Sequence, residues 1–350
     1  MPNRATAGDF DPDLLVLFDA YVHGDVDRRM FLRRAQRYAK AGATATGLLA
    51  ALSPNFASGQ QVRPDDARLQ IERVSAPAGA AGGEGLRGLL VRSASAGANP
   101  LPAVLVVHEN RGLNPHIEDI ARRLALDGFM AYAPDALTPL GGYPGDEDKA
   151  RRAFATLDAE RTRAGFLAAA RWLDARADST GRLGAVGFCW GGGIVHWLAT
   201  QLAELDAGVP FYGNPPPSDL AGRVKAPLLV HLAGTDERVN AAWPAYESAL
   251  TAAGAKWELH RYPGTQHGFN NDTTPRYDAV AAKAAGSGPW GSSGSAWPES
   301  QGSAGDAPSW HPSPPILAPA RRRDQRKRQR AGRSTCRGAG WAHARSVNLQ

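Results

Sequence analysis

The residues most suited to chemistry begin with Cys189, which lies in the motif Gly-Phe-Cys-Trp-Gly-Gly at positions 187–192. An apolar run from Leu183 precedes the motif and a helix-like stretch at 194–199 follows it, so the pattern predicts a strand, a sharp turn and a helix. Glycines two residues before and after the cysteine remove Cβ atoms that would clash in a tight turn. The motif therefore predicts a nucleophile elbow with a thiol at its apex. A buried cysteine between packing glycines is the alternative interpretation.

Two further side chains could complete a catalytic triad with this thiol. Asp236 follows the apolar run at 227–234, and His267 lies in a loop after the alternating stretch at 256–262. The chain order nucleophile, acid, histidine is the one that brings all three groups to the carboxyl edge of an α/β-hydrolase sheet. Taken singly, Asp236 could instead cap a helix beginning near Asn240, and His267 could be an ordinary loop histidine.

A third group of candidates follows the apolar run at 101–107. Glu109 is placed where it could approach the thiol, and the alternative is a surface ion pair between Glu109 and Arg111. In this fold, the loop after such a strand and the residue after the nucleophile each supply a backbone N–H to an oxyanion hole. We assign these two donors to Asn110 and Trp190.

The elements that must position these residues alternate as in an α/β protein with a doubly wound, mostly parallel sheet, the α/β-hydrolase fold. Dinucleotide binding is excluded because Cys189 stands where the motif G-x-G-x-x-G needs its second glycine. Glycines and prolines within 135–148 indicate a loop over the site. The pattern predicts strands at 86–91, 103–108, 129–134, 183–188, 207–212, 227–233 and 256–262, and helices at 115–127, 159–177, 194–199 and 241–253.

The combination of His-Glu at 108–109, Gly-x-Cys-x-Gly-Gly at 187–192 and His-Gly-Phe at 267–269 resembles the dienelactone hydrolase family over residues 61–283. The resemblance implies a Cys-Asp-His triad, and it implies that Glu109 controls the resting thiol and takes part in its deprotonation. Dienelactone hydrolases proper also hold the substrate carboxylate with two arginines. This chain has no arginine at either expected place, soon after Asp135 or at 270–272, which argues against a dienelactone as the natural substrate.

The residue types predict a thiol-dependent hydrolase of lactones or activated carboxylic esters. His267, oriented by Asp236, would accept the thiol proton, because the thiolate is the attacking form of cysteine. A thioester would form, and His267 would activate water to release the acid. Because a thiolate is itself a good leaving group, small activated esters are favoured over peptides. The alternative function is a non-catalytic or impaired α/β-hydrolase-fold protein that binds a ligand or partner.

Composition sets further limits. The two cysteines, Cys189 and Cys336, do not form a disulfide framework, and no cysteine or histidine spacing indicates a metal or a cofactor. We interpret four other histidines as packed or hydrogen-bonded scaffold residues: His108, His196, His231 and His260. No apolar run reaches the length of a transmembrane helix.

The net charge of +6 arises outside the predicted catalytic domain. Residues 284–350 hold ten Lys and Arg against three Asp and Glu, so residues 1–283 carry a net charge of −1. A specific nucleic-acid partner is not expected, because the basic run at 321–328 has no interleaved aromatic residues. The expected partner is a small-molecule substrate, and the oligomeric state is left open.

Residues 1–60 form a separate segment with two interpretations. The motif Asp-Arg-Arg-Met-Phe-Leu at 27–32 resembles a twin-arginine export signal, and 41–52 is largely apolar. The alternative is an uncleaved helical extension whose Leu and Phe residues pack on the hydrolase domain. The two interpretations correspond to a periplasmic and a cytoplasmic protein, respectively.

Residues 284–350 change in character to a Gly-, Ser-, Pro- and Arg-rich sequence, which predicts a disordered tail. This tail holds four of the nine tryptophans. Such a composition is also what out-of-frame translation of a GC-rich gene would produce, and we favour that origin over a basic nucleic-acid arm. If this is correct, the chain lacks the full closing helix of the family's fold.

Overall fold

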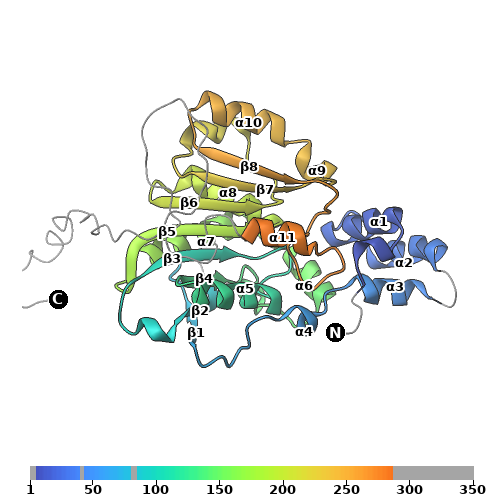
Figure 1. Cartoon of the computed structure of the whole chain (residues 1–350), viewed down its shortest axis with the longest axis horizontal. Coiled ribbons are helices and arrows are strands. Elements are labelled where there is room, and N and C mark those ends of the chain that lie inside the picture. Colours follow the sequence, from blue (N-terminus) through green and yellow to red (C-terminus); the bar gives the residue numbers. More distant parts are fainter. Residues whose placement is uncertain (1–4, 40–42, 80–84, 287–350) are drawn as a thin grey trace, which may run out of the picture. The chain divides into compact units, whose positions relative to one another are not determined.

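An eight-stranded sheet is the central element of the computed structural model, which describes residues 5–39, 43–79 and 85–286 (Figure 1). The strand order is β1-β2-β4-β3-β5-β6-β7-β8. Strand β2 pairs antiparallel with β1 and β4, and the other neighbours are parallel. The strands are β1 (Leu69–Ser75), β2 (Arg87–Ser93), β3 (Leu101–Val107), β4 (Met130–Pro134), β5 (Ser179–Phe188), β6 (Leu205–Phe211), β7 (Leu228–Ala233) and β8 (Trp257–Tyr262).

Helices cover both faces of the sheet, and this confirms the predicted doubly wound, mostly parallel fold. The α-helices are α1 (Pro12–His23), α2 (Arg28–Ala35), α3 (Ala45–Leu52), α4 (Phe56–Gly59), α5 (Pro115–Leu126), α6 (Glu147–Phe154), α7 (Ala159–Asp174), α8 (Trp190–Gln201), α9 (Glu237–Asn240), α10 (Trp243–Ala252) and α11 (Ala279–Gly286). Short 3-10 helices lie at Ala7–Asp9, Gln36–Tyr38, Ala94–Ala96, Thr138–Leu140 and Ser218–Arg223.

The period-two alternation of β3 divides the core between the two faces. Ala103, Leu105 and Val107 lie in the cluster that includes side chains of α7, α8 and α10. Val104 and Val106 lie in the opposite cluster, which includes side chains of α5 and α11. Both sets are fully buried, so a continuous apolar run was the correct signal for a strand covered on both sides.

Several elements were not predicted, among them β1 and α6. Strand β1 carries only one buried residue along its length, as expected for an edge strand, and so lacks a strong apolar pattern. Helix α6 begins inside the segment assigned to a loop, where Asp146 accepts a hydrogen bond from the backbone N–H of Lys149 and caps it. The closing helix α11 continues to Gly286, three residues beyond the predicted domain end. The rest of the predicted tail lies outside the described residues.

The first three helices form a small apolar cluster of their own, the N-terminal module (residues 5–39 and 43–52). Phe18, Tyr21, Phe31 and Leu52 are buried in it, and Phe31 is fully enclosed. Each helix has a side-chain cap: Asp11 on α1, Asp27 on α2 and Thr44 on α3. These helices correspond to the helical extension that was one of the two interpretations of residues 1–60, and their Leu and Phe side chains pack on one another. The export signal stays a prediction. Among the described residues, no helix is long and apolar enough to cross a membrane.

Candidate active site

Cys189 lies at a sharp turn between β5 and α8 and has a left-handed backbone with φ of 55°. A Cβ atom on Gly187 would come within 2.2 Å of the backbone oxygen of Gly191. A Cβ on Gly191 would come within 2.4 Å of the backbone oxygen of Val107. Real Cβ atoms do not approach oxygen so closely, so both positions need glycine. The turn has the geometry that the sequence motif predicts for a nucleophile elbow.

Asp236 and His267 form a direct pair at the same sheet edge. The Nδ1 atom of His267 lies 2.5 Å from Oδ2 of Asp236, and both side chains are buried. The other carboxylate oxygen of Asp236 accepts a hydrogen bond from the backbone N–H of Val239 and caps α9. The two oxygens of Asp236 therefore serve different partners, and the helix that it caps begins at Glu237 rather than near Asn240. Its role as the acid of a triad stays a prediction.

Two histidines approach the thiol of Cys189, and one of them, His23, was not predicted. Sγ of Cys189, a ring nitrogen of His267 and a ring nitrogen of His23 all lie within 4.8 Å of one another. Sγ is 3.5 Å from Nε2 of His23, at the end of α1. Nε2 of His267 is buried and has no hydrogen-bond partner among the described residues. This Cys and His set could also hold a metal ion, because thiolate and imidazole are zinc ligands.

The surroundings favour the ionised form of the thiol. Burial alone would raise the pKa of Cys189, but the positive charge that His267 carries when it is protonated and the hydrogen bond from His23 outweigh it and lower the pKa to about 5. Burial would lower the pKa of His267, yet the neighbouring Cys189 charge and the bond to Asp236 raise it. For Asp236, the bond to His267 overcomes the effect of burial and lowers the pKa.

The loop after β3 brings Glu109 to this edge but pairs it differently from either expectation. Oε2 of Glu109 accepts a hydrogen bond of 2.9 Å from the side-chain amide of Asn271. Arg111 is buried, and its Nε lies 3.7 Å from Oε2 of Glu147 instead. The alternative of a surface Glu109 and Arg111 pair does not describe this arrangement. The control of the thiol by Glu109 stays a prediction.

The two oxyanion-hole candidates, Asn110 and Trp190, lie on either side of the elbow. Trp190 is the first residue of α8, and its ring stacks on His108 with centroids 5.5 Å apart. The side chain of Asn110 donates a hydrogen bond of 3.0 Å to the backbone oxygen of Val22. The assignment of their backbone N–H groups to an oxyanion stays a prediction.

The four histidines interpreted as scaffold lie away from the thiol. His108, His196 and His231 are buried, and His108 Nε2 accepts the backbone N–H of Ala136 at 3.0 Å. His260 is half exposed and lies 2.7 Å from Glu258. The sequence does not identify His23 as a site residue, because the surrounding Tyr-Val-His-Gly at 21–24 indicates only the end of a helix. No local pattern relates it to a residue 166 positions later.

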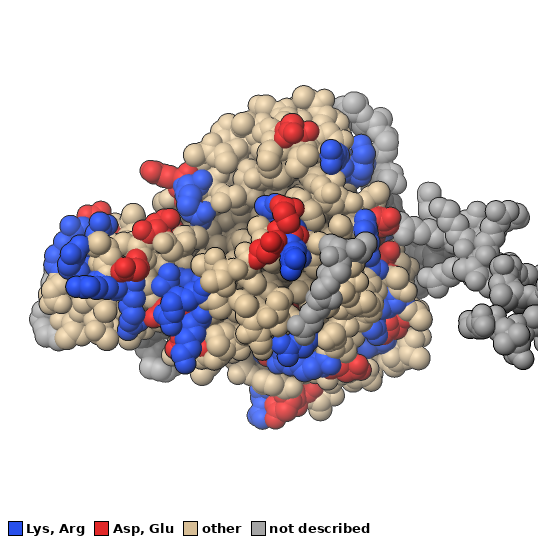
Figure 2. Space-filling view, turned by 180° about the vertical axis from the view of Figure 1, so that it is seen from behind, with Lys and Arg blue, Asp and Glu red and all other residues tan. Residues whose placement is uncertain are grey.

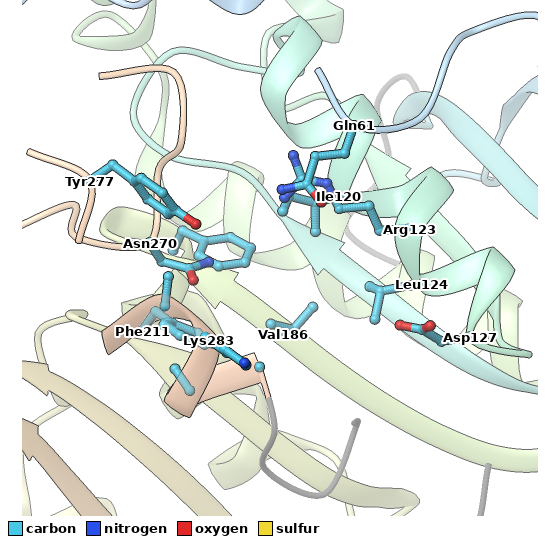
Figure 3. A pocket seen from close by; sticks show the side chains of 14 residues that line it. Gln61, Ile120, Arg123, Leu124, Asp127, Val186, Phe211, Asn270, Tyr277 and Lys283 are labelled. Carbon is cyan, nitrogen blue, oxygen red and sulfur yellow. The ribbon is translucent and has the colours of Figure 1, made fainter. Parts of the chain in front are cut away.

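A cavity of about 340 Å³ lies away from these residues, between α5 and the end of α11 (Figure 3). Figure 3 shows Leu124 and Asp127 on one side of it and Asn270 and Tyr277 on the other. Its floor includes Val186, Phe188 and Phe211 of the sheet. It borders Gly286 at the end of α11, and none of Cys189, Asp236 and His267 lines it.

Charges are distributed over the surface in both signs. Figure 2 shows basic side chains interspersed with acidic ones on the face opposite to that of Figure 1, with wide areas that carry neither. This agrees with the net charge of −1 for residues 1–283. The described part of this face therefore offers little to attract a polyanion.

Comparisons with known proteins agree with this geometry. Residues 86–287 match the model of the dienelactone hydrolase family, and residues 1–40 match a second model described as YqhI-like. A putative carboxymethylenebutenolidase of Escherichia coli is 37% identical over 199 residues, which cover 53% of this chain and 73% of that protein. A putative hydrolase fragment of the same organism, YghX, is 49% identical over 108 residues, 31% of this chain and 91% of the fragment.

Among solved structures, a putative dienelactone hydrolase from Klebsiella pneumoniae superposes with a TM-score of 0.56 at 30% identity. The superposition covers 62% of this chain and 95% of that protein. The shared region is therefore a whole hydrolase fold, to which this chain adds further segments.

Proposed function

Because the chain belongs to the dienelactone hydrolase family, we propose that it hydrolyses lactones or activated carboxylic esters with Cys189 as the nucleophile. The observation that carries the proposal is the thiol at the elbow beside the His267 and Asp236 pair. A buried thiol with a pKa of about 5 is largely thiolate at neutral pH and is ready to attack a carbonyl carbon.

The reaction proceeds in two halves. The thiolate adds to the carbonyl carbon, and negative charge on the carbonyl oxygen is stabilised by backbone N–H groups, which we assign to Asn110 and Trp190. Collapse of this adduct expels the alcohol or enolate and leaves a thioester. Nε2 of His267, which has no partner among the described residues, then accepts a proton from water. The resulting hydroxide attacks the thioester and regenerates the thiolate.

The substrate class follows from the leaving groups. When the adduct collapses, an enolate or activated alkoxide competes well with the thiolate, whereas an amine does not. The name of the Escherichia coli relative, a putative carboxymethylenebutenolidase, supports the same class of carboxylic ester or lactone.

The first prediction tests the nucleophile. We expect Cys189→Ala to lower kcat/KM for a small activated ester, such as a 4-nitrophenyl ester, by roughly a thousandfold or more. Cys336→Ala is the matched control, because it removes the other thiol of the chain and should leave the rate unchanged. Equal rates for the wild type and Cys189→Ala would favour the alternative, a hydrolase-fold protein that binds without catalysing.

A further inference from the structure

The N-terminal module extends one histidine to the catalytic thiol. Helix α1 ends at His23, and the next residue, Gly24, has φ of 92° and turns the chain away. Nε2 of His23 lies 3.5 Å from Sγ of Cys189, and its ring packs edge-on against His267 with centroids 4.7 Å apart. His23 therefore touches the atom that reacts and lies beside the histidine already assigned to the triad.

The other nitrogen of the His23 ring faces Asp19, as that of the His267 ring faces Asp236. Nδ1 of His23 lies 2.9 Å from the backbone oxygen of Asp19 and 3.2 Å from its carboxylate. Nη1 of Arg276, from the loop after His267, donates a hydrogen bond of 3.0 Å to the same carboxylate. The sequence Cys189, His23, Asp19 is thus a second thiol, imidazole and carboxylate series.

The module is also fixed to the loops around the thiol. The backbone oxygen of Val22 accepts hydrogen bonds from Asn110 at 3.0 Å and from Arg111 at 3.1 Å. Tyr21 and Arg28 both donate to the carboxylate of Asp148, at the start of α6. The position of His23 is therefore set by contacts on both of its flanks.

We propose that His23 is a second catalytic histidine, which takes the proton of the Cys189 thiol and holds the thiolate until substrate binds, while His267 is kept for the water step. This inference rests on the proposed function and adds a residue from the N-terminal module to the reaction. Nδ1 of His23 faces two acceptors and so carries a proton, which leaves Nε2 to exchange one with Sγ.

The proton count closes over one turnover. In the resting pair, the S–H bond has been broken and the proton is on Nε2 of His23. After the thiolate forms the thioester, His23 gives this proton to the departing alkoxide. In the second half, His267 takes a proton from water, the C–S bond breaks, and the carboxylic acid loses its proton to solvent. Transfer from His267 to His23 then restores the resting ion pair.

Charged groups from every neighbouring element face this pair. They are Asp19 and Arg276 beyond His23, and His267 and Arg238 on the other side; Arg111 also lies in the field of the thiol. The Nη2 atom of Arg238 is 3.0 Å from Nε2 of His23. A guanidinium only donates, so Arg238 can hydrogen-bond to Nε2 only while Nε2 carries no proton. In the resting pair Nε2 holds the proton, and Arg238 is then a neighbouring positive charge. Burial would lower the pKa of His23, but Asp19 and Cys189 raise it to about 10.

The experiment follows the ionisation of Cys189 without substrate, in a Cys336→Ala background that leaves one thiol. The rate of alkylation by iodoacetamide is measured against pH. For the wild type we expect a midpoint near the pKa of about 5, below which the thiol is protonated and unreactive. For His23→Gln we expect the midpoint to rise by about one pH unit or more, which lowers the alkylation rate near pH 5 by about fivefold or more.

Two further measurements separate a chemical role from a structural one. His260→Gln is the matched control, because His260 is half exposed on β8 and should leave the midpoint unchanged. His23→Ala opens a space beside the thiol, so added imidazole should restore the alkylation rate and kcat/KM in this variant, and it should leave the rates of His260→Gln unchanged. Rescue by imidazole distinguishes a missing proton acceptor from a displaced module.

An unchanged midpoint in His23→Gln, together with the absence of imidazole rescue in His23→Ala, would overturn the proposal. Because alkylation requires no turnover, that result would leave the hydrolase function intact. Conversely, a wild-type rate in Cys189→Ala would remove the hydrolase mechanism while the alkylation data still report whether His23 ionises the thiol.

Discussion

At the scale of the residue, two imidazoles approach one sulfur atom from opposite parts of the chain. His267 comes from the loop after β8, and His23 comes from the end of α1. Each has a carboxylate behind it, Asp236 for His267 and Asp19 for His23. In the proposed mechanism, one ring accepts the proton of the thiol and the other accepts a proton from water, whereas a simple triad assigns both steps to a single ring.

Whether the site can bind an anionic substrate also depends on single residues. Arg111 is buried, and its guanidinium serves Asn110, Val22 and Glu147. Arg238 is exposed and lies beside both histidines. One cation that already faces the thiolate is a weak anchor for a carboxylate.

We predict that neutral esters are hydrolysed at least as well as carboxylated ones. A neutral 4-nitrophenyl ester and its ω-carboxylated counterpart of equal chain length would be compared by kcat/KM. In Arg238→Gln, we expect the ratio of the two values to change by less than about threefold. A strong preference for the anionic ester that is lost in Arg238→Gln would contradict the prediction and assign substrate binding to Arg238.

The proximity of Cys189, Asp236 and His267 could be predicted from the sequence because each lies in a local pattern. The glycines around Cys189, the apolar run before Asp236 and the alternating stretch before His267 indicate a turn and two strands. His23 could not be found in this way, because its contact with Cys189 depends on how a separate helix docks. Arg276 was missed for the same reason: its partner Asp19 is 257 positions away.

At the scale of the element, α6 connects the N-terminal module to the hydrolase fold. The segment 135–148 was expected to be a loop over the site; α6 begins only at its last two residues, and the covering of the site stays a prediction. Asp148 of this helix accepts a hydrogen bond from Arg28, which is one of the two arginines in the motif that resembles an export signal. Arg28 therefore has a structural partner in the folded chain, and Phe31 of the same motif is fully buried.

The docking contact can be tested by Asp148→Asn. We expect a loss of about 1 kcal/mol in the free energy of unfolding, because Tyr21 and Arg28 both lose a charged acceptor that is partly shielded from water. Asp65→Asn removes the exposed partner of Arg63 and should leave the free energy of unfolding nearly unchanged. Equal losses from chemical denaturation of the two variants would show that Asp148 does not anchor the module.

At the scale of the whole chain, the family match ends at residue 287, where the composition turns to Gly, Ser, Pro and Arg. The last described helix, α11, ends one residue earlier beside the cavity lined by Val186 and Phe211. The end of the family match and the change in composition therefore fall at the same place in the chain. The origin of that sequence stays a prediction.

Deletion of 287–350 should therefore leave catalysis unchanged. We expect kcat/KM within about twofold of the full chain, because a segment without a periodic apolar face adds little to a core. Replacing the deleted segment with an amphipathic helix that continues α11 should raise the melting temperature by filling the cavity. A loss of activity on deletion would mean that the segment packs on the domain and that its composition was misinterpreted.

The contact between Asp19 and Arg276 also has a consequence in time. Asp19 is synthesised 257 residues before Arg276, which at about 5 to 20 residues per second is an interval of roughly 13 to 50 s. During that interval the nascent chain holds His23 and the earlier docking residues Asn110, Arg111 and Asp148, but it lacks Arg276. The thiol of Cys189, made in between, also stays without His267 until translation of the hydrolase region is nearly finished. We therefore expect the thiolate to reach its full reactivity only late in synthesis, when the molecule is ready to use it.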